Sequence, residues 1–182
     1  MKNSALKIRI LGDPVLRRRS KAVKRTSEHR RSILSEMAQI MYGNAGIGLA
    51  APQVGINERM IVADIGGGLY KLINPRIVKR QGHQVTQEGC LSVPDVCIKI
   101  KRAKKVAVRA EDENGKPLTI KAQDLLACVL QHEIDHLDGK LIVDYASLFQ
   151  RIKIRRKIEK MKEGACDEKL RKSETKSCKL QL

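Results

Sequence analysis

Apolar residues fall at helical spacing in two segments of the chain. The first segment predicts an amphipathic helix that begins at an N-cap, Ser27, and stops at a left-handed Gly43. Its single apolar face is expected to pack on the core of the domain. The second segment predicts a helix over residues 124–138, with Asp124 as the capping residue and Gly139 as the terminator.

Between these helices, short runs show the alternation that is typical of β-strands. A Gly-Gly-Gly run and an Asn-Gly turn join neighbouring runs, which predicts antiparallel hairpins. Asn74-Pro75 interrupts the pattern once. The expected strands are residues 59–65, 69–73, 76–79, 104–111 and 118–121. The pattern as a whole predicts an α+β fold.

The length of 182 residues suits one domain with a real core, which we place at residues 1–150. Residues 151–182 carry 12 Lys and Arg against 5 Asp and Glu, and are expected to form a basic helix and tail. The formal net charge of the chain is +17. Such an excess attracts polyanions, so nucleic acid, ribosomal RNA and anionic membrane surfaces are all candidates on charge alone.

The amino terminus lacks the pattern of a signal peptide, and no stretch reaches the roughly 18 apolar residues of a spanning helix. We therefore expect a cytoplasmic protein without a membrane partner. The five cysteines form an odd set without the spacing of a disulfide framework, which favours reduced thiols.

The candidate chemistry lies in the second helix, where residues 132–136 read His-Glu-Ile-Asp-His. Histidines at i and i+4 share one face of a helix and can bind one metal ion. Glu133 lies on the flank of that face, from which it can reach a water molecule without being a ligand. The preceding residues are largely apolar, and burial of these polar groups without a metal would cost several kcal/mol.

A catalytic ion usually takes a third protein ligand. Cys90, in a short segment that Pro94 prevents from continuing as a regular strand, is a candidate, although a lone cysteine is more often a small buried hydrophobe. Cys128 is its rival, but three ligands from one continuous helix would converge poorly. His29 and His83 lie in polar surroundings and are weak candidates.

The chain resembles the peptide deformylases in three segments that occur in the order of that family. These segments are Gly46-Ile47-Gly48-Leu49-Ala50-Ala51-Pro52-Gln53, Glu88-Gly89-Cys90-Leu91-Ser92 and Gln131-His132-Glu133-Ile134-Asp135-His136. The resemblance covers about residues 7–150. It implies antiparallel β-sheets packed around a central metal-binding helix.

The resemblance also implies roles for residues at matching positions. The implied metal ligands are Cys90, His132 and His136, and Glu133 is the implied general base and acid. Gln53 and the backbone N–H of Leu91 correspond to the groups that stabilise the oxyanion.

Substrate binding is assigned in two ways. The resemblance places the substrate peptide along the strand of Gly46 and Gly48, where the missing side chains allow close backbone approach. Helix geometry adds a pocket for the methionine side chain. The residues expected to line this pocket are Ile47, Leu125, Cys128 and Val129. One position departs from the family pattern, because Cys97 stands where many bacterial members carry an arginine or another larger residue.

The implied reaction removes the formyl group from the N-terminal methionine of nascent polypeptides and releases formate. The ion lowers the pKa of its water, and the resulting hydroxide attacks the formyl carbonyl. The resemblance implies Fe²⁺ as the ion, with Zn²⁺, Ni²⁺ or Co²⁺ as substitutes, whereas ligand preference alone would suggest zinc. It also implies that the basic tail contacts ribosomal RNA near the exit tunnel, and we expect a monomer.

Two other functions fit part of the pattern. A zinc endopeptidase would share the helix motif but take its third ligand from beyond it, and acids such as Asp144 remain open for this role. A ribosome- or RNA-binding module would use the positive charge and keep the metal for structure. Metal loss in Cys90→Ala would distinguish a deformylase from a zinc endopeptidase. Formate release from a formylated peptide would distinguish it from a binding module.

Overall fold

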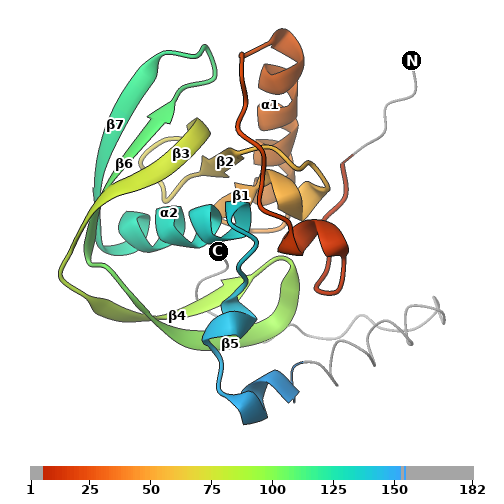
Figure 1. Cartoon of the computed structure of the whole chain (residues 1–182), viewed down its shortest axis with the longest axis vertical. Coiled ribbons are helices and arrows are strands. Elements are labelled where there is room, and N and C mark those ends of the chain that lie inside the picture. The colour runs from red at the N-terminus through yellow and green to blue at the C-terminus, as the bar shows by residue number, and fades with distance from the viewer. Residues whose placement is uncertain (1–5, 153, 155–182) are drawn as a thin grey trace.

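The computed structural model describes residues 6–152 and residue 154. In this part of the chain, two antiparallel sheets lie on either side of helix α2 (Figure 1). The strand order is β1-β2-β3-β6-β7 in the five-stranded sheet and β4-β5 in the two-stranded sheet. The strands are β1 (Gly48–Ala50), β2 (Met60–Ala63), β3 (Tyr70–Gln81), β4 (Gln84–Cys90), β5 (Val93–Arg102), β6 (Lys105–Glu111) and β7 (Pro117–Gln123).

The helices are α1 (Glu28–Gly43) and α2 (Asp124–Leu137), with 3₁₀ helices η1 (Pro14–Arg17), η2 (Ala51–Val54) and η3 (Ile142–Tyr145). Residues 148–152 and 154 are also helical. No helix in the described residues is long and apolar enough to cross a membrane. The expected basic tail over 151–182 lies, apart from residues 151, 152 and 154, outside the described residues.

Helix α1 has the N-cap that its sequence predicts, because the backbone N–H of Arg30 donates to the Ser27 hydroxyl at 3.3 Å. The predicted stop at Gly43 is confirmed, but the left-handed conformation expected for Gly43 is wrong. Gly43 is the last helical residue, and Ala45 adopts the left-handed conformation with φ 53°. The expected apolar face is confirmed, since α1 packs Met37, Met41 and neighbouring side chains on the five-stranded sheet.

The predicted hairpins are confirmed by the pairing of β2 with β3 and of β6 with β7. The expected break at Asn74-Pro75 is wrong, because β3 continues through it with a shift in register. Asn74 takes the left-handed conformation, and its side-chain amide bonds the backbone N–H and C=O of Val23 at 2.8 and 2.9 Å. These contacts stabilise a bend within β3. From local propensity alone, the same residues predict the end of a strand.

The β4–β5 hairpin was not predicted, and the expected effect of Pro94 is wrong. Pro94 is the second residue of β5. Proline is tolerated there because a two-stranded sheet has only edge strands, which leave one row of N–H groups unpaired. Val96, Ile98 and Ile100 alternate along β5 and are buried, so the sequence did contain the signal of a strand.

Helix α2 runs between the sheets and is buried along most of its length. Its apolar side chains Ala127, Val129, Leu130 and Ile134 pack on the inner face of the five-stranded sheet. The cap assigned to Asp124 is wrong, because the N-cap is Gln123 and Asp124 is the first residue of α2, where it has a left-handed φ of 51°. The predicted cap differs from the observed one because strand β7 ends at Gln123 and helix α2 begins at the next residue.

Cysteine chemistry also differs from expectation. Cys90 and Cys128 are free and buried, whereas Cys97 is disulfide-bonded. The expectation of reduced thiols is therefore wrong for Cys97. Spacing in the sequence could not show this, because a disulfide depends on Cα atoms approaching to about 4.4–6.8 Å in the folded chain.

Gly139 ends α2 in the left-handed conformation, with φ 74°. A Cβ there would lie 2.6 Å from the backbone oxygen of Arg17. We expect Gly139→Ala to lower the free energy of unfolding by roughly 1–3 kcal/mol, measured by urea denaturation. Gly67→Ala is the control, because a Cβ at Gly67 would meet no atom within 4 Å. Equal stability of the two variants would contradict this account.

Candidate metal centre and active site

Three possible metal ligands converge between α2 and the end of β4. The Nε2 atoms of His132 and His136 are 3.1 Å apart, and the Sγ of Cys90 lies 3.3 Å from Nε2 of His136. All three ligand atoms lie within 4.8 Å of one another and belong to buried residues. The fold therefore brings these three residues together, as expected.

The cluster fits one metal ion. Four-coordinate bonds of about 2.0–2.1 Å to nitrogen and 2.3 Å to sulfur place neighbouring ligand atoms roughly 3.3–3.6 Å apart. Burial raises the pKa of the Cys90 thiol to about 12 and lowers the pKa of His136 well below its usual value. A divalent cation would favour the thiolate and leave the imidazoles neutral, which are the states that bind metal.

The structure separates Cys90 from its rivals. The Cys128 thiol faces β4 and accepts hydrogen bonds from Gln84 at 3.1 Å and from Thr86 at 3.7 Å. His29 and His83 are exposed. Asp144 bonds Arg17 at 2.6 Å and the N–H of Leu141 at 2.9 Å, so its carboxylate is engaged away from the cluster.

Glu133 lies beside the cluster as a buried carboxyl group. Neither of its oxygens has a hydrogen-bond partner among the described residues. Burial, with the charge of Glu88 next in importance, raises its pKa well above the usual value. A buried carboxyl group without partners is costly, and its raised pKa suits a group that accepts and returns a proton near neutral pH.

Gln53 is held with a defined orientation. Its Oε1 accepts from the backbone N–H of Ala50 at 2.7 Å, and its Nε2 donates to the Sγ of Cys90 at 3.6 Å. Because the oxygen is already used by a backbone donor, the NH₂ group is the end that faces the cluster. Gln53 is fully buried, so this donor is fixed in position.

A network that sequence reasoning missed supports His132. Glu88 accepts from Nδ1 of His132 at 3.0 Å and from Nε and Nη2 of Arg102, each at 2.8 Å. Burial alone would raise the pKa of Glu88, but the bonds from Arg102 and His132 outweigh it and lower the pKa to about 2. The third nitrogen of Arg102, Nη1, donates to the carboxylate of Asp135. Asp135 also accepts from the Tyr145 hydroxyl at 2.7 Å.

This network fixes the ring of His132 and leaves its Nε2 for the metal. The sequence contained two signals for the acidic members of this network. Glu88 precedes Cys90 by two residues, and Asp135 lies within the His132–His136 motif. The basic partner Arg102 gave no signal, since only the fold brings it to them.

The residues expected to bind substrate lie around the same centre. A Cβ on Gly48 would lie 2.3 Å from an oxygen of Glu133 and 3.0 Å from Val129. A Cβ on Gly46 would lie 3.1 Å from the side chain of Leu91. Ile47 and Leu125 are partly buried in the core that includes Val129, whereas the thiol of Cys128 points to β4.

Comparisons with known proteins agree with this geometry. The family profile described as polypeptide deformylase matches residues 5–152. A peptide deformylase of Thermoanaerobacter pseudethanolicus is 51% identical over 142 residues, covering 78% of this chain and 89% of that protein. The chain belongs to the polypeptide deformylase family. It is a metal-dependent hydrolase that removes the N-formyl group from nascent polypeptides.

Solved structures support the deformylase fold. The crystal structure of a peptide deformylase from Legionella pneumophila is 41% identical with a TM-score of 0.85, covering 92% of this chain and 100% of that one. A peptide deformylase from Synechococcus elongatus, solved in complex with actinonin, is also 41% identical, with a TM-score of 0.79. That match covers 88% of this chain and 90% of the other. The expected α+β fold is confirmed.

The contact between Gly48 and Glu133 predicts a loss of activity. In Gly48→Ala, the added methyl group must displace the Glu133 carboxyl, so we expect kcat/KM for formyl-Met-Ala to fall at least about 100-fold. Metal content should stay unchanged, because neither residue belongs to the ligand cluster. Gly43→Ala, whose Cβ would meet nothing within 4 Å, should keep full activity.

The Glu88 network predicts an effect on metal retention. Glu88→Gln removes the charge that orients His132, so metal affinity should fall about 10–100-fold in a competition with a chelator. Glu113→Gln is the matched control, because Glu113 pairs with Lys71 at the surface. Unchanged metal affinity in Glu88→Gln would show that His132 does not need this support.

Proposed function

We propose that Cys90, His132 and His136 hold one Fe²⁺ ion at which the formyl group of N-formylmethionyl peptides is hydrolysed. The observation that carries this proposal is the buried set of three ligand atoms beside the partnerless carboxyl of Glu133. Membership of the deformylase family supplies the substrate. When bound, the ion supplies a Lewis acid that polarises the carbonyl and lowers the pKa of water.

Iron as the ion rests on the resemblance, and the donor set itself is compatible with several metals. One thiolate and two imidazoles bind Zn²⁺, Fe²⁺, Ni²⁺ or Co²⁺. The thiolate also brings a negative charge, which weakens the Lewis acidity of the ion compared with a site of three imidazoles. Burial of Cys90 limits the access of oxidants to its sulfur.

Glu133 is proposed to move the proton during hydrolysis. Its carboxylate accepts a proton from the attacking water and then delivers it to the nitrogen of the leaving amine. The raised pKa of Glu133 makes its carboxylate a stronger base, which favours the first step. The missing side chain of Gly48 leaves the space that the carboxyl occupies, because a Cβ there would lie 2.3 Å from one of its oxygens.

Gln53 and the backbone N–H of Leu91 are proposed to stabilise the charge that develops on the formyl oxygen. The NH₂ group of Gln53 already faces Cys90, and Leu91 follows Cys90 in the chain. Donors that are held in advance stabilise this charge without a cost of reorganisation during the reaction.

The substrate peptide is proposed to lie along Gly46 and Gly48. Strand β1 forms one end of the five-stranded sheet within the described residues, so it can accept an added strand. Ile47, Leu125 and Val129 would then contact the methionine side chain, with Cys128 at the base of the pocket.

Further proposals concern the location of the enzyme in the cell, its oligomeric state and its contact with the ribosome. We infer that the enzyme is a cytoplasmic monomer, and that its basic segment over residues 151–182 contacts ribosomal RNA near the exit of the nascent chain. The excess of Lys and Arg in this segment supports the contact.

Two variants test the roles of the site. Glu133→Ala should lower formate release from formyl-Met-Ala by about 10²–10⁴-fold while the metal stays bound. Cys90→Ala should lose the metal, whereas Cys128→Ala should retain it. Assays without oxygen, combined with metal analysis, measure both quantities.

Other outcomes would favour the alternatives. Stoichiometric metal in Cys90→Ala, together with cleavage of internal peptide bonds, would indicate an endopeptidase. Full formate release by Glu133→Ala would remove the proton-transfer role of Glu133.

A further inference from the structure

The five-stranded sheet has a cationic face on the side away from α2. Along β6, Val106, Val108 and Ala110 point into the core that contains α2, so the residues between them point to the opposite side. With the paired residues of β3 and β7, they form three rows across the strands. The rows are Arg76, Arg109 and Thr119; Lys79, Ala107 and Lys121; and Gln81, Lys105 and Gln123.

We call these nine residues the basic sheet face. Five of them are Lys or Arg, and these cations are exposed. The one acidic residue on this side of β6 is Glu111, which lies in the next row, opposite Ile73 and Pro117. A register shift between Ile77 and Lys79 contributes to this arrangement. Without the extra residue in β3, Lys79 would point to the side of Ile77, which packs in the core.

The basic sheet face places like charges next to one another. Arg76 lies directly opposite Arg109 in the pairing of β3 with β6. None of its five cations forms an ion pair or a side-chain hydrogen bond with a described residue. Like charges directly opposite one another in a sheet are destabilising, so these residues are not explained by the stability of the fold.

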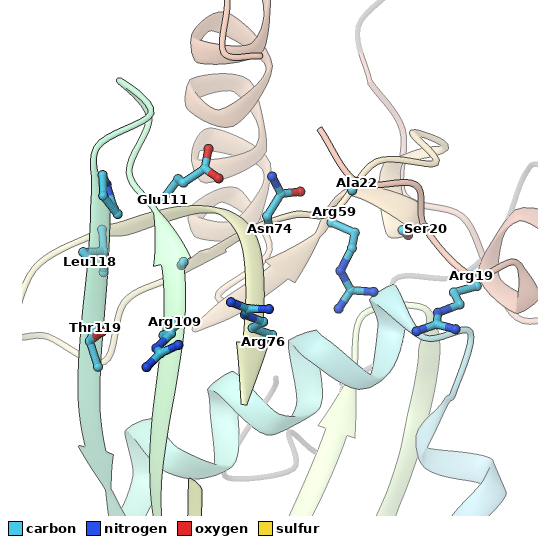
Figure 2. A pocket seen from close by; sticks show the side chains of 12 residues that line it. Arg19, Ser20, Ala22, Arg59, Asn74, Arg76, Arg109, Glu111, Leu118 and Thr119 are labelled. Carbon is cyan, nitrogen blue, oxygen red and sulfur yellow. The ribbon is translucent and has the colours of Figure 1, made fainter. Parts of the chain in front are cut away.

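The surface along this face is hollowed in two places. One hollow, of about 930 Å³, is lined by four arginines (Arg19, Arg59, Arg76 and Arg109) and by one acidic residue, Glu111. Arg59 is paired with Asp138 at 2.8 Å, which leaves the other three arginines without an acidic partner in the ion pairs of the described residues. Figure 2 shows the four arginine side chains one after another, from β6 across β3 to the segments before β2 and α1. A second hollow, of about 320 Å³, is lined by Lys79, Lys105 and Lys121 together with other residues.

We propose that the basic sheet face binds the phosphate backbone of folded RNA. Successive rows lie about 6.6–6.8 Å apart along the strands, so the face offers a repeated positive charge to a polymer with a repeated negative charge. Arginine also fits phosphate with two parallel hydrogen bonds.

The composition of the face distinguishes RNA phosphates from other anionic partners. No aromatic residue belongs to it, so bases have no platform to stack on, and recognition is independent of sequence. It also presents no large apolar side chain, such as those that insert into a lipid surface. This inference goes beyond the contact proposed for residues 151–182, because it places an RNA contact on the catalytic domain itself.

The test compares two charge-reversed forms of the full chain. Arg76→Glu with Arg109→Glu changes the basic sheet face, and Lys99→Glu with Lys101→Glu is the matched control. The control residues are exposed on the two-stranded sheet, and each double variant lowers the net charge by four. Binding to a fluorescent RNA duplex is measured by anisotropy over a range of KCl concentrations.

The Arg76/Arg109 variant should bind the duplex at least about tenfold more weakly at low salt, and the slope of log K against log salt should fall by about two. The control should lose much less affinity. Both variants should keep the wild-type kcat/KM for formyl-Met-Ala, which shows that they are folded and separates this test from that of the proposed function.

Equal losses of affinity in the two variants would overturn the proposal, because binding would then follow net charge alone. Unchanged binding in the Arg76/Arg109 variant would do the same. Loss of binding to phosphatidylserine vesicles without loss of RNA binding would assign the face to lipid instead.

The single variant Arg109→Glu adds a second readout. It replaces a cross-strand repulsion with an Arg76–Glu pair, so its unfolding temperature should equal or exceed that of the wild type while RNA affinity falls. A lower unfolding temperature together with unchanged RNA affinity would show that Arg109 has a structural role only.

Discussion

The burial of polar groups on α2 is the constraint on which the rest of the structure depends. His132, Glu133 and His136 lie on a helix that is enclosed between two sheets, where a polar group without a partner costs several kcal/mol. Each group is accommodated differently. The histidines meet Cys90 in a set that fits a cation, and Glu133 remains without a partner beside Gly48. The least stabilised group of the helix is therefore the one proposed to exchange protons.

The two sheets have separate roles in this arrangement. The five-stranded sheet provides the apolar surface on which α2 packs, and its terminal strand β1 brings Gly48 to Glu133. The two-stranded sheet provides Cys90, Glu88 and Arg102. Because Arg102 bridges Glu88 and Asp135, the ion pairs join this sheet to the helix at the point where the three possible metal ligands meet. Buried ion pairs of this kind position groups more than they add stability.

The positive charge of the chain is distributed unevenly. Around the metal centre, Arg102 is balanced by Glu88 and Asp135, so the site carries little excess charge from its surroundings. On the far side of the five-stranded sheet, Arg76 and Arg109 face each other without acidic partners. The outer residues of β3, β6 and β7 are free of the constraints of the core, which is why the same strands can pack α2 on one side and carry unpaired cations on the other.

The sequence by itself determined the parts of this protein that depend on local order. The spacing of His132 and His136 is a property of any α-helix, and alternation with Gly- and Asn-rich turns predicted the hairpins of β2–β3 and β6–β7. Helix geometry and the family resemblance already favoured Cys90 over Cys128, and the tertiary structure supplied the contacts behind this choice, because the Cys128 thiol accepts hydrogen bonds from Gln84 and Thr86 on β4. The tertiary structure also brought Arg102 to Glu88, carried β3 through Asn74-Pro75 and paired Arg76 with Arg109. These features depend on contacts between segments far apart in the chain, which no local pattern records.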